Sequence, residues 1–254
     1  MPIWPCKHPT GMSFANDHFS AVAARYAEFR PHYPDALVDA LADRSPACDL
    51  AWDVGCGNGQ LSVALARRFA RVIATDPSSA QLASAQPHDR VDYRCEPAEA
   101  STLADASADL VVVAQAAHWF DWPRFVAEVS RVARPSGLVA LVVYGNVSGP
   151  GMDDYRTAVE SYWPPGREHV DNGYRDLVFP WPAIAAPSIE MTEQWTRDDV
   201  FGYATTWSST QRMVKAVGPA ALDELRDRLA AIWPDNEPRT VSWPLTLKLS
   251  HRIV

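Results

Sequence analysis

The feature that most constrains the fold is a regular alternation of short apolar segments with helical segments between residues 50 and 144. The apolar segments predict strands at residues 50–54, 71–75, 91–94, 108–114 and 138–144. The fourth of them contains an unbroken run of Leu and Val, which is typical of a strand buried on both faces. Strands that alternate with helices in this way predict a doubly wound α/β fold with a mostly parallel, Rossmann-like sheet.

The rest of the chain is expected to extend this core into one domain over residues 1–254. Residues 13–29 carry apolar and aromatic side chains at helical spacing, so residues 1–34 are predicted to form an N-terminal lid helix and its connection. Residues 35–145 form the predicted ligand-binding core. Residues 146–183, rich in Gly, Pro and aromatics, are expected to form a cap inserted over the cleft. Residues 184–254 are expected to complete the sheet, with a strand at 184–195, helices at 197–206 and 219–232, and an antiparallel final strand at 240–249.

Charge and cysteine content exclude several classes of function. The net charge is −8 and no run of Lys and Arg is present, which argues against a nucleic-acid partner. No apolar run approaches the roughly 20 residues that a membrane span needs, and the N-terminus does not resemble a secretory signal. We therefore expect a soluble, cytoplasmic protein that contacts no membrane. The four cysteines form no C-x-x-C pair, so we expect them to be reduced and to bind no metal.

The sharpest functional signal is a glycine-rich loop where the first strand meets the next helix. It reads Asp-Val-Gly-Cys-Gly-Asn-Gly over residues 53–59. Glycines let the backbone turn tightly and let a ligand lie against main-chain atoms, and open α/β sheets bind ligands at the carboxyl ends of their strands. The spacing is G-x-G-x-G, whereas a dinucleotide site would have G-x-G-x-x-G. The predicted ligand contacts in this loop are Asp53, Gly55, Cys56, Gly57 and Gly59.

An acid closes the second predicted strand. Asp76 lies about 20 residues past the glycine loop, where a carboxylate can accept hydrogen bonds from both hydroxyls of a ribose. Pro77 follows it and is counted with the same site. In front of the loop, Asp53 suits a ligand with an ammonium group better than a pyrophosphate. A glycine loop alone could be a structural turn, but the loop together with both acids favours a ligand site.

Four segments of the chain resemble the class I S-adenosylmethionine-dependent methyltransferases. The resemblance is strongest to the methyltransferase type 11 subgroup that includes trans-aconitate-methyltransferase-like proteins. The segments are residues 26–34, 53–59, 98–99 and 115–121. The resemblance implies that S-adenosyl-L-methionine is the cofactor, with the glycine loop on its methionyl part, Asp76 on its ribose, and Ala98 and Glu99 near its adenine. Many relatives have Asp at the position of Pro97, so this chain departs from the pattern there.

The segment after the fourth strand supplies the candidates for chemistry. Gln115 could face the donated methyl group, or its amide could be satisfied by backbone atoms. His118 could accept a proton from an acceptor hydroxyl, because its free pKa is near neutral, or it could simply pack and form one hydrogen bond. Trp119 is expected to line the pocket wall.

The predicted lid supplies the candidates for acceptor recognition. They are Tyr26, Arg30 and Tyr33. The planar fork of Arg30 matches a carboxylate, whether of the donor or of the acceptor; a surface ion pair is the structural alternative.

The expected activity is direct methyl transfer to a small-molecule acceptor, with a carboxylic acid as the favoured class. Two alternatives stay open: a non-catalytic protein that binds S-adenosylmethionine, and a nicotinamide-dependent oxidoreductase. The loop spacing and the lack of a Tyr-x-x-x-Lys pair count against the oxidoreductase. The sequence leaves the oligomeric state open.

Overall fold

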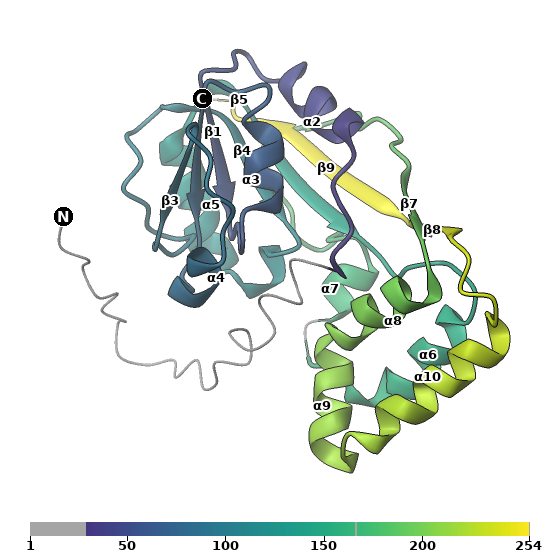
Figure 1. The fold of residues 1–254 in the computed structure, drawn as a ribbon. Helices are drawn as coiled ribbons and strands as arrows, with labels where there is room; N and C mark the ends of the chain where they lie inside the picture. The colour runs from purple at the N-terminus through teal and green to yellow at the C-terminus, as the bar shows by residue number, and fades with distance from the viewer. Residues whose placement is uncertain (1–28, 166, 254) are drawn as a thin grey trace.

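The core of the molecule is a twisted sheet. The computed structural model describes residues 29–165 and 167–253. The sheet contains β1 (Leu50–Val54), β2 (Arg71–Thr75), β3 (Val91–Arg94), β4 (Ala108–Ala114), β5 (Ala133–Tyr144), β6 (Ala183–Ile184) and β9 (Leu245–His251). Their order is β3-β2-β1-β4-β5-β9-β6 (Figure 1). Strands β1 to β5 are parallel, and β9 runs antiparallel to β5. The predicted Rossmann-like fold with an antiparallel final strand is confirmed.

Helices cover both faces of the sheet because alternate strand residues are apolar on both sides. The core helices are α2 (Asp35–Ala42), α3 (Gln60–Leu65), α4 (Ser79–Ala83) and α5 (Trp122–Val132). In β4, Leu110 and Val112 pack with residues of α2 and α3, whereas Val111 and Val113 pack with residues of α5. The two-residue period of a strand thus divides the unbroken apolar run between two layers.

Two helix starts show how the local sequence sets the boundaries. Asp121 caps α5, where its side chain accepts a hydrogen bond from the backbone N–H of Arg124. Helix α3 begins differently, because its N-cap is Gly59 with φ 82°. The left-handed backbone that the loop needs at this position favours glycine over a residue with a side chain.

The cap is a second, mostly helical layer built on aromatic packing. It contains α6 (Met152–Val159), α7 (Arg167–Asp171), α8 (Arg197–Thr205), α9 (Ser208–Val217), α10 (Ala220–Ile232) and a two-stranded antiparallel sheet of β7 (Met191–Trp195) with β8 (Arg239–Trp243). Helices α6, α8, α9 and α10 gather on one side of the sheet (Figure 1). Their shared core contains the buried aromatic residues Tyr155, Phe201, Tyr203, Trp207, Trp233 and Trp243. This helical layer includes residues of the stretch 146–183 and also residues 191–243.

The C-terminal part of the prediction needs correction. The strand expected at 184–195 is two strands, β6 and β7, in different sheets. The strand expected at 240–249 is likewise divided into β8 and β9 at Pro244, which has no N–H to donate to a ladder. Only β6 and β9 complete the main sheet, so residues 191–243 belong to the cap. Helix α9 was not predicted, and the predicted helix at 13–29 lies almost wholly outside the described residues.

Candidate functional site

The glycine loop lies at the carboxyl end of β1, beside the end of β2. Gly55, Gly57 and Gly59 all have positive φ values, of 70°, 56° and 82°. The backbone N–H groups of Gly55 and Cys56 both donate to the carbonyl oxygen of Thr75, at 2.8 and 3.0 Å. These hydrogen bonds fix the loop to the last residue of β2, so its position depends on two parallel strands.

Each glycine of the loop has a different neighbour. A Cβ added to Gly55 would lie 2.6 Å from the Cβ of Ala116, so the loop touches the segment 115–121 that follows β4. A Cβ on Gly59 would collide with the ring of Tyr93. At Gly57 the nearest atom would be Oε1 of Gln81, at 3.9 Å. The space next to the Gly57 α-carbon is therefore open to a ligand, whereas Gly55 and Gly59 are required by packing within the protein.

Asp76 is joined directly to this loop. Its Oδ2 accepts a hydrogen bond from the N–H of Gly57 at 2.9 Å, and its Oδ1 accepts one from the N–H of Ser78 at 2.8 Å. Burial raises the pKa of Asp76, against the lowering effect of these two bonds. Each carboxylate oxygen can accept a further hydrogen bond, which is what two ribose hydroxyls require. Pro77 is exposed beside it.

Asp53 occupies the inner side of the loop. It is 1% exposed, and its Oδ2 accepts a hydrogen bond of 2.6 Å from the hydroxyl of Ser62 in α3. Burial raises its pKa to about 7, against the Ser62 hydrogen bond and with a further rise from the charge of Asp76. Asp53 thus connects the loop to α3 from the protein interior. Any effect of Asp53 on a ligand ammonium would be electrostatic and would not involve direct contact.

The cysteines agree with the expectation at the loop and depart from it elsewhere. Burial, followed by the charges of Asp53 and Asp76, raises the pKa of the Cys56 thiol, so Cys56 is a protonated, small residue in the loop. Cys48 and Cys56 are free, but Cys95 is in a disulfide. The expectation that all cysteines are reduced is therefore wrong, because spacing along a sequence does not show which sulfurs a fold brings together.

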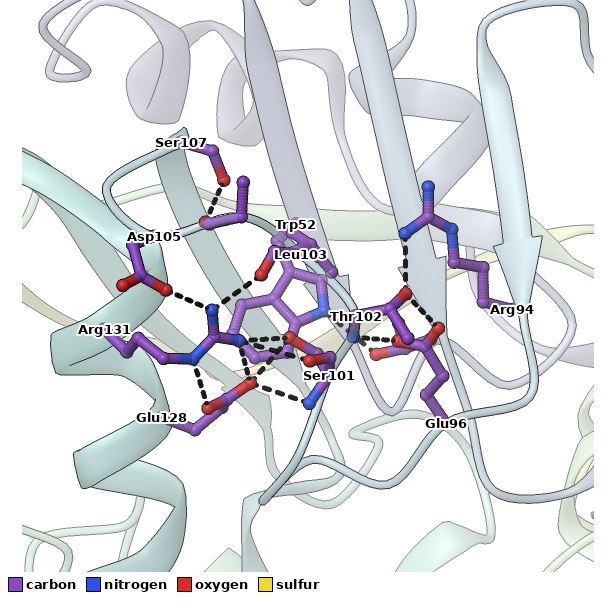
Figure 2. A network of polar contacts seen from close by, with 12 residues as sticks. Trp52, Arg94, Glu96, Ser101, Thr102, Leu103, Asp105, Ser107, Glu128 and Arg131 are labelled. Carbon is purple, nitrogen blue, oxygen red and sulfur yellow. Dashed lines mark hydrogen bonds and ion pairs between the residues drawn. The ribbon is translucent and has the colours of Figure 1, made fainter.

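A polar network fixes the connection between β3 and β4, which carries Ala98 and Glu99. Figure 2 shows the Arg131 guanidinium of α5 among the carboxylates of Glu128 and Asp105 and the backbone of the connection. Arg131 donates to Glu128 Oε1 at 2.6 Å, and Glu128 accepts from both N–H and hydroxyl of Ser101 at 2.7 Å. Burial would raise the pKa of Glu128, but the bonds from Arg131 and Ser101 hold it at about 2.

The two residues near the predicted adenine position, Ala98 and Glu99, lie in the same connection. Ala98 is 4% exposed, so its contribution to a ligand is limited to a small surface. Glu99 accepts a hydrogen bond of 2.8 Å from the N–H of Asp121, at the start of α5. Glu99 thus links the connection to the same helix.

The candidates after β4 adopt the structural alternatives that the sequence left open. Gln115 has a φ of 58°, and its Nε2 donates to the carbonyl oxygen of Tyr144 at 2.8 Å, so the amide nitrogen is satisfied by backbone. His118 lies in a short 3-10 helix (Ala117–Trp119), and its Nδ1 is 2.9 Å from the hydroxyl of Tyr174. Trp119 is 66% exposed.

The electrostatic environment keeps His118 neutral. Burial is the largest cause that lowers its pKa, to about 4, and the charges of His169 and Arg167 lower it further. A neutral imidazole at physiological pH can accept or donate a hydrogen bond but carries no charge.

The lid residues meet the core and the cap at the end of β5. Nη1 of Arg30 donates to the Tyr144 hydroxyl at 3.1 Å, and its guanidinium lies 5.4 Å from the ring centroid of Tyr203 in α8. Tyr33 contacts the same Tyr144 ring, at a centroid distance of 6.2 Å. Tyr26 lies outside the described residues. The lid segment thus connects the strand that ends the core with a helix of the cap.

Sequence reasoning missed the residues that the cap brings to this edge. Asn146, Trp163, Arg167 and Tyr174 all belong to the stretch after β5 in which no helical or strand period is visible. Only the density of aromatic residues there could have indicated a packed layer. Among the described residues, no group of three or more His, Cys, Asp or Glu could hold a metal ion, and no helix could cross a membrane.

Comparisons with known proteins agree on one family. The model of the methyltransferase domain matches residues 52–141. A protein of Dictyostelium discoideum that carries the name of a methyltransferase is 32% identical over 260 residues, which span 96% of this chain and 98% of that protein. The malonyl-acyl-carrier-protein O-methyltransferase of Pseudescherichia vulneris is 27% identical over 226 residues, 84% of this chain and 85% of that protein.

A solved structure supports the same assignment. A protein of Anaeromyxobacter dehalogenans that carries the name of a type II methyltransferase is 41% identical and superposes with a TM-score of 0.82. The match covers 89% of this chain and 99% of that one. The sequence similarity to both relatives extends over nearly the whole length of the chain, and the glycine loop and the sheet agree with it. The chain belongs to the methyltransferase family and is a class I S-adenosylmethionine-dependent enzyme.

Proposed function

We propose that the chain binds S-adenosyl-L-methionine between the glycine loop and Asp76 and transfers its methyl group to a small carboxylic acid. The observation that carries the donor part is the hydrogen bond between the Gly57 N–H and Asp76. It joins a glycine whose α-carbon has no close neighbour to a carboxylate with spare acceptor capacity. Asp76 therefore fits the ribose of a nucleoside, and the backbone at Gly57 fits its amino-acid substituent.

The donor residues divide the work of binding. Asp76 would accept the ribose hydroxyls, with Pro77 beside it. The backbone at Gly57 would lie against the methionyl part, and Ala98 and Glu99 would bound the adenine. Gln115 follows β4 at the same edge of the sheet, where its remaining amide oxygen would lie near the reacting atoms.

The chemistry asks little of the protein beyond alignment. When bound, S-adenosylmethionine supplies a methyl group already activated by a positive sulfur. A carboxylate oxygen bonds to the methyl carbon as the carbon–sulfur bond breaks and its electron pair passes to sulfur, so no proton is moved. Positioning and exclusion of water can contribute roughly 7–11 kcal/mol to such a step. A neutral His118 is compatible with this acceptor, since a carboxylate needs no general base.

Two considerations support an acidic acceptor. A chain with net charge −8 has no general field that attracts anions, so recognition of one needs a local cation. The sequence indicates Arg30 for this role, and a further cation, Arg167, lies at the same edge of the sheet. In addition, the relative from Pseudescherichia vulneris is named for methylation of a malonyl group.

Binding and turnover test this proposal separately. Calorimetry should show that S-adenosylhomocysteine binds and that NADH does not. A panel of acetate, malonate, benzoate and octanoate, with phenol and an amine beside them, is then screened for S-adenosylhomocysteine release. Release with an acid supports the whole proposal. Binding with release only from phenol or the amine overturns the acceptor class, binding without any release favours the non-catalytic alternative, and binding of NADH alone overturns the donor.

A further inference from the structure

A second arginine, supplied by the cap, lies at the same edge of the sheet as the predicted site. Arg167 is the first residue of α7, and its Nη2 donates to the side-chain oxygen of Asn146 at 2.5 Å. Asn146 is two residues past the end of β5, and β5 pairs in parallel with β4, which leads to His118. The cap therefore places a guanidinium beside the carboxyl ends of β4 and β5, where ligands of this fold class bind.

Three contacts hold the Arg167 guanidinium in a fixed orientation. Its centre lies 4.3 Å from the ring centroid of Trp163, which covers one face. Trp163 in turn contacts Trp207 in the aromatic core of the cap, at a centroid distance of 5.7 Å. Nε donates to Asp171 at 2.9 Å and Nη2 to Asn146. A guanidinium restrained by stacking and by two hydrogen bonds loses little conformational entropy when it binds an anion.

The same contacts leave the end of the guanidinium available. Among the described residues no partner of Nη1 is found, and this nitrogen is not one of the buried unsatisfied atoms. An arginine has five N–H donors, of which these contacts use two. The remaining donors on Nη1 and Nη2 point from the end of the fork, the edge that forms two parallel bonds to a carboxylate.

Arg30 differs from Arg167 in how its guanidinium is used. Arg30 donates to the Tyr144 hydroxyl and lies over the Tyr203 ring, and its Nε is buried. Those contacts connect the lid segment to the core and the cap. Arg30 therefore has the surroundings of a structural link, whereas Arg167 has the surroundings of a binding residue.

We propose that Arg167, oriented by Trp163 and Asn146, binds the carboxylate of the methyl acceptor, and that Arg30 instead joins the lid to the cap. This inference rests on the proposed function, because it needs an anionic acceptor at the edge formed by β4 and β5. The uncharged state of His118 supports it, since His118 supplies no competing positive charge. Asp171 forms an ion pair with Nε at 2.9 Å and Asn146 accepts from Nη2, so both partners bond to one side of the guanidinium.

Three variants of the full-length protein separate the roles of these arginines. Arg167→Met removes the charge and keeps an aliphatic stem, and Arg167→Lys keeps the charge without the fork. Arg30→Met tests the competing assignment. Arg175→Met is the matched control, because Arg175 is an exposed cation of the same cap segment. Each variant is first titrated with S-adenosylhomocysteine; affinity within about twofold of wild type shows that the donor site is intact.

The acceptor is then measured in two ways. The acid that wild type turns over is assayed for kcat and KM, and the same acid is titrated by calorimetry into protein saturated with S-adenosylhomocysteine. We expect Arg167→Met to raise KM and the dissociation constant about thirtyfold, with kcat within about threefold and an intermediate value for Arg167→Lys. Arg175→Met should change neither constant, and Arg30→Met should change the acid's dissociation constant by less than about threefold.

Three results would overturn the inference. One is an unchanged KM in Arg167→Met together with a raised KM in Arg30→Met, which returns the acceptor to Arg30. Another is an equal loss in Arg167→Met for an uncharged acceptor, which would make the residue structural. The third is normal S-adenosylhomocysteine binding by wild type with no affinity for any acid of the panel. Failure of S-adenosylhomocysteine binding in wild type would instead refute the proposed function itself.

Discussion

The core and the cap of this molecule are built on different principles. In the core, aliphatic residues alternate along paired parallel strands, and the hydrogen-bonded register fixes where each strand ends. In the cap, short helices pack through large aromatic rings, and the two regions share apolar contacts, because Tyr144 of β5 packs in the aromatic cluster and Tyr174 packs against the sheet. The donor residues follow strand ends of the core, whereas Arg167 and Tyr174 belong to the cap. Donor recognition should therefore depend on the core alone, and acceptor recognition on the contact between the two regions.

The largest effect should come from closing the open space at Gly57. Gly57→Ala introduces a methyl group where the backbone would meet the donor, at a position with φ 56°. We expect S-adenosylhomocysteine to bind about a hundredfold more weakly in calorimetry. We also expect no measurable binding of an acid acceptor, because the acceptor site would lack the bound donor beside it.

Gly218→Ala supplies a control for the backbone strain alone. Gly218 also has a positive φ, of 92°, and a Cβ there would meet no atom within 4 Å. It lies in the cap, between α9 and α10, and its ψ of 165° belongs to a region that glycine alone adopts readily, so the variant should lose up to about 3 kcal/mol of stability and retain normal donor affinity. Equal loss of donor affinity in both variants would break the distinction between core and cap.

The accuracy of the sequence prediction follows the same division. The bounds of β1, β2, β3 and β4 were predicted as observed. Apolar runs bounded by turn residues predict the buried strands β1, β2 and β4, whereas β3 is only partly buried at the edge of the sheet. The cap was predicted only in outline, since its short helices meet through aromatics without a helical period. A linear pattern could not show that Pro244 divides one apolar run between two sheets, or that Tyr93 occupies the space beside Gly59. Nor could it show that Arg167 reaches Asn146.

A second core variant tests the carboxylate that binds the ribose. Asp76→Asn keeps the shape of the side chain and one of its two oxygens. It removes the charge and the oxygen that accepts one of the two backbone N–H bonds. Charge-assisted hydrogen bonds contribute about 1.5–3 kcal/mol each, so we expect roughly thirtyfold weaker binding of S-adenosylhomocysteine. Asp223→Asn, on the exposed surface of α10, is the control for lost charge. Unchanged affinity in Asp76→Asn would remove Asp76 from the donor site.

The Glu128 network tests whether the core is stabilised independently of the cap. The folded pKa of Glu128 lies at about 2, below its ordinary value of 4.5, because Arg131 and Ser101 bond to the carboxylate against the effect of burial. A lowered folded pKa means that the stabilisation is present above about pH 4.5 and is lost as the pH falls toward 2. Glu128→Gln should therefore cost about 1.5 kcal/mol at pH 7, with a difference from wild type that shrinks below pH 4.5.

Chemical denaturation between pH 7 and pH 3 measures this difference. Glu224→Gln, at an exposed position of α10, should follow the wild-type curve at every pH. A penalty for Glu128→Gln that stays constant down to pH 3 would show that lost packing, not the charge, accounts for it. A fall in donor affinity beyond about threefold would show that the network also positions Ala98 and Glu99.

The smallest effect on turnover is expected for substitution of His118, whose ring contacts the Tyr174 hydroxyl. Its folded pKa lies near 4, mainly because of burial and then because of His169 and Arg167, so NMR should show a titration midpoint close to 4 instead of 6.5. Between those values an unfolded chain takes up the proton and the folded one does not, so this residue reduces stability as the pH falls from 6.5 toward 4. Tyr174→Phe keeps the burial and removes one hydrogen bond, and the midpoint should stay below 6.5.

If the acceptor is a carboxylate, His118→Gln and Tyr174→Phe should change kcat by less than about threefold, with a flat profile from pH 6 to pH 9, because neither group has a proton to move. A loss of about a hundredfold in His118→Gln, restored by no change of pH, would mean that the acceptor must lose a proton to His118, and the cap would then take part in catalysis as well as in recognition.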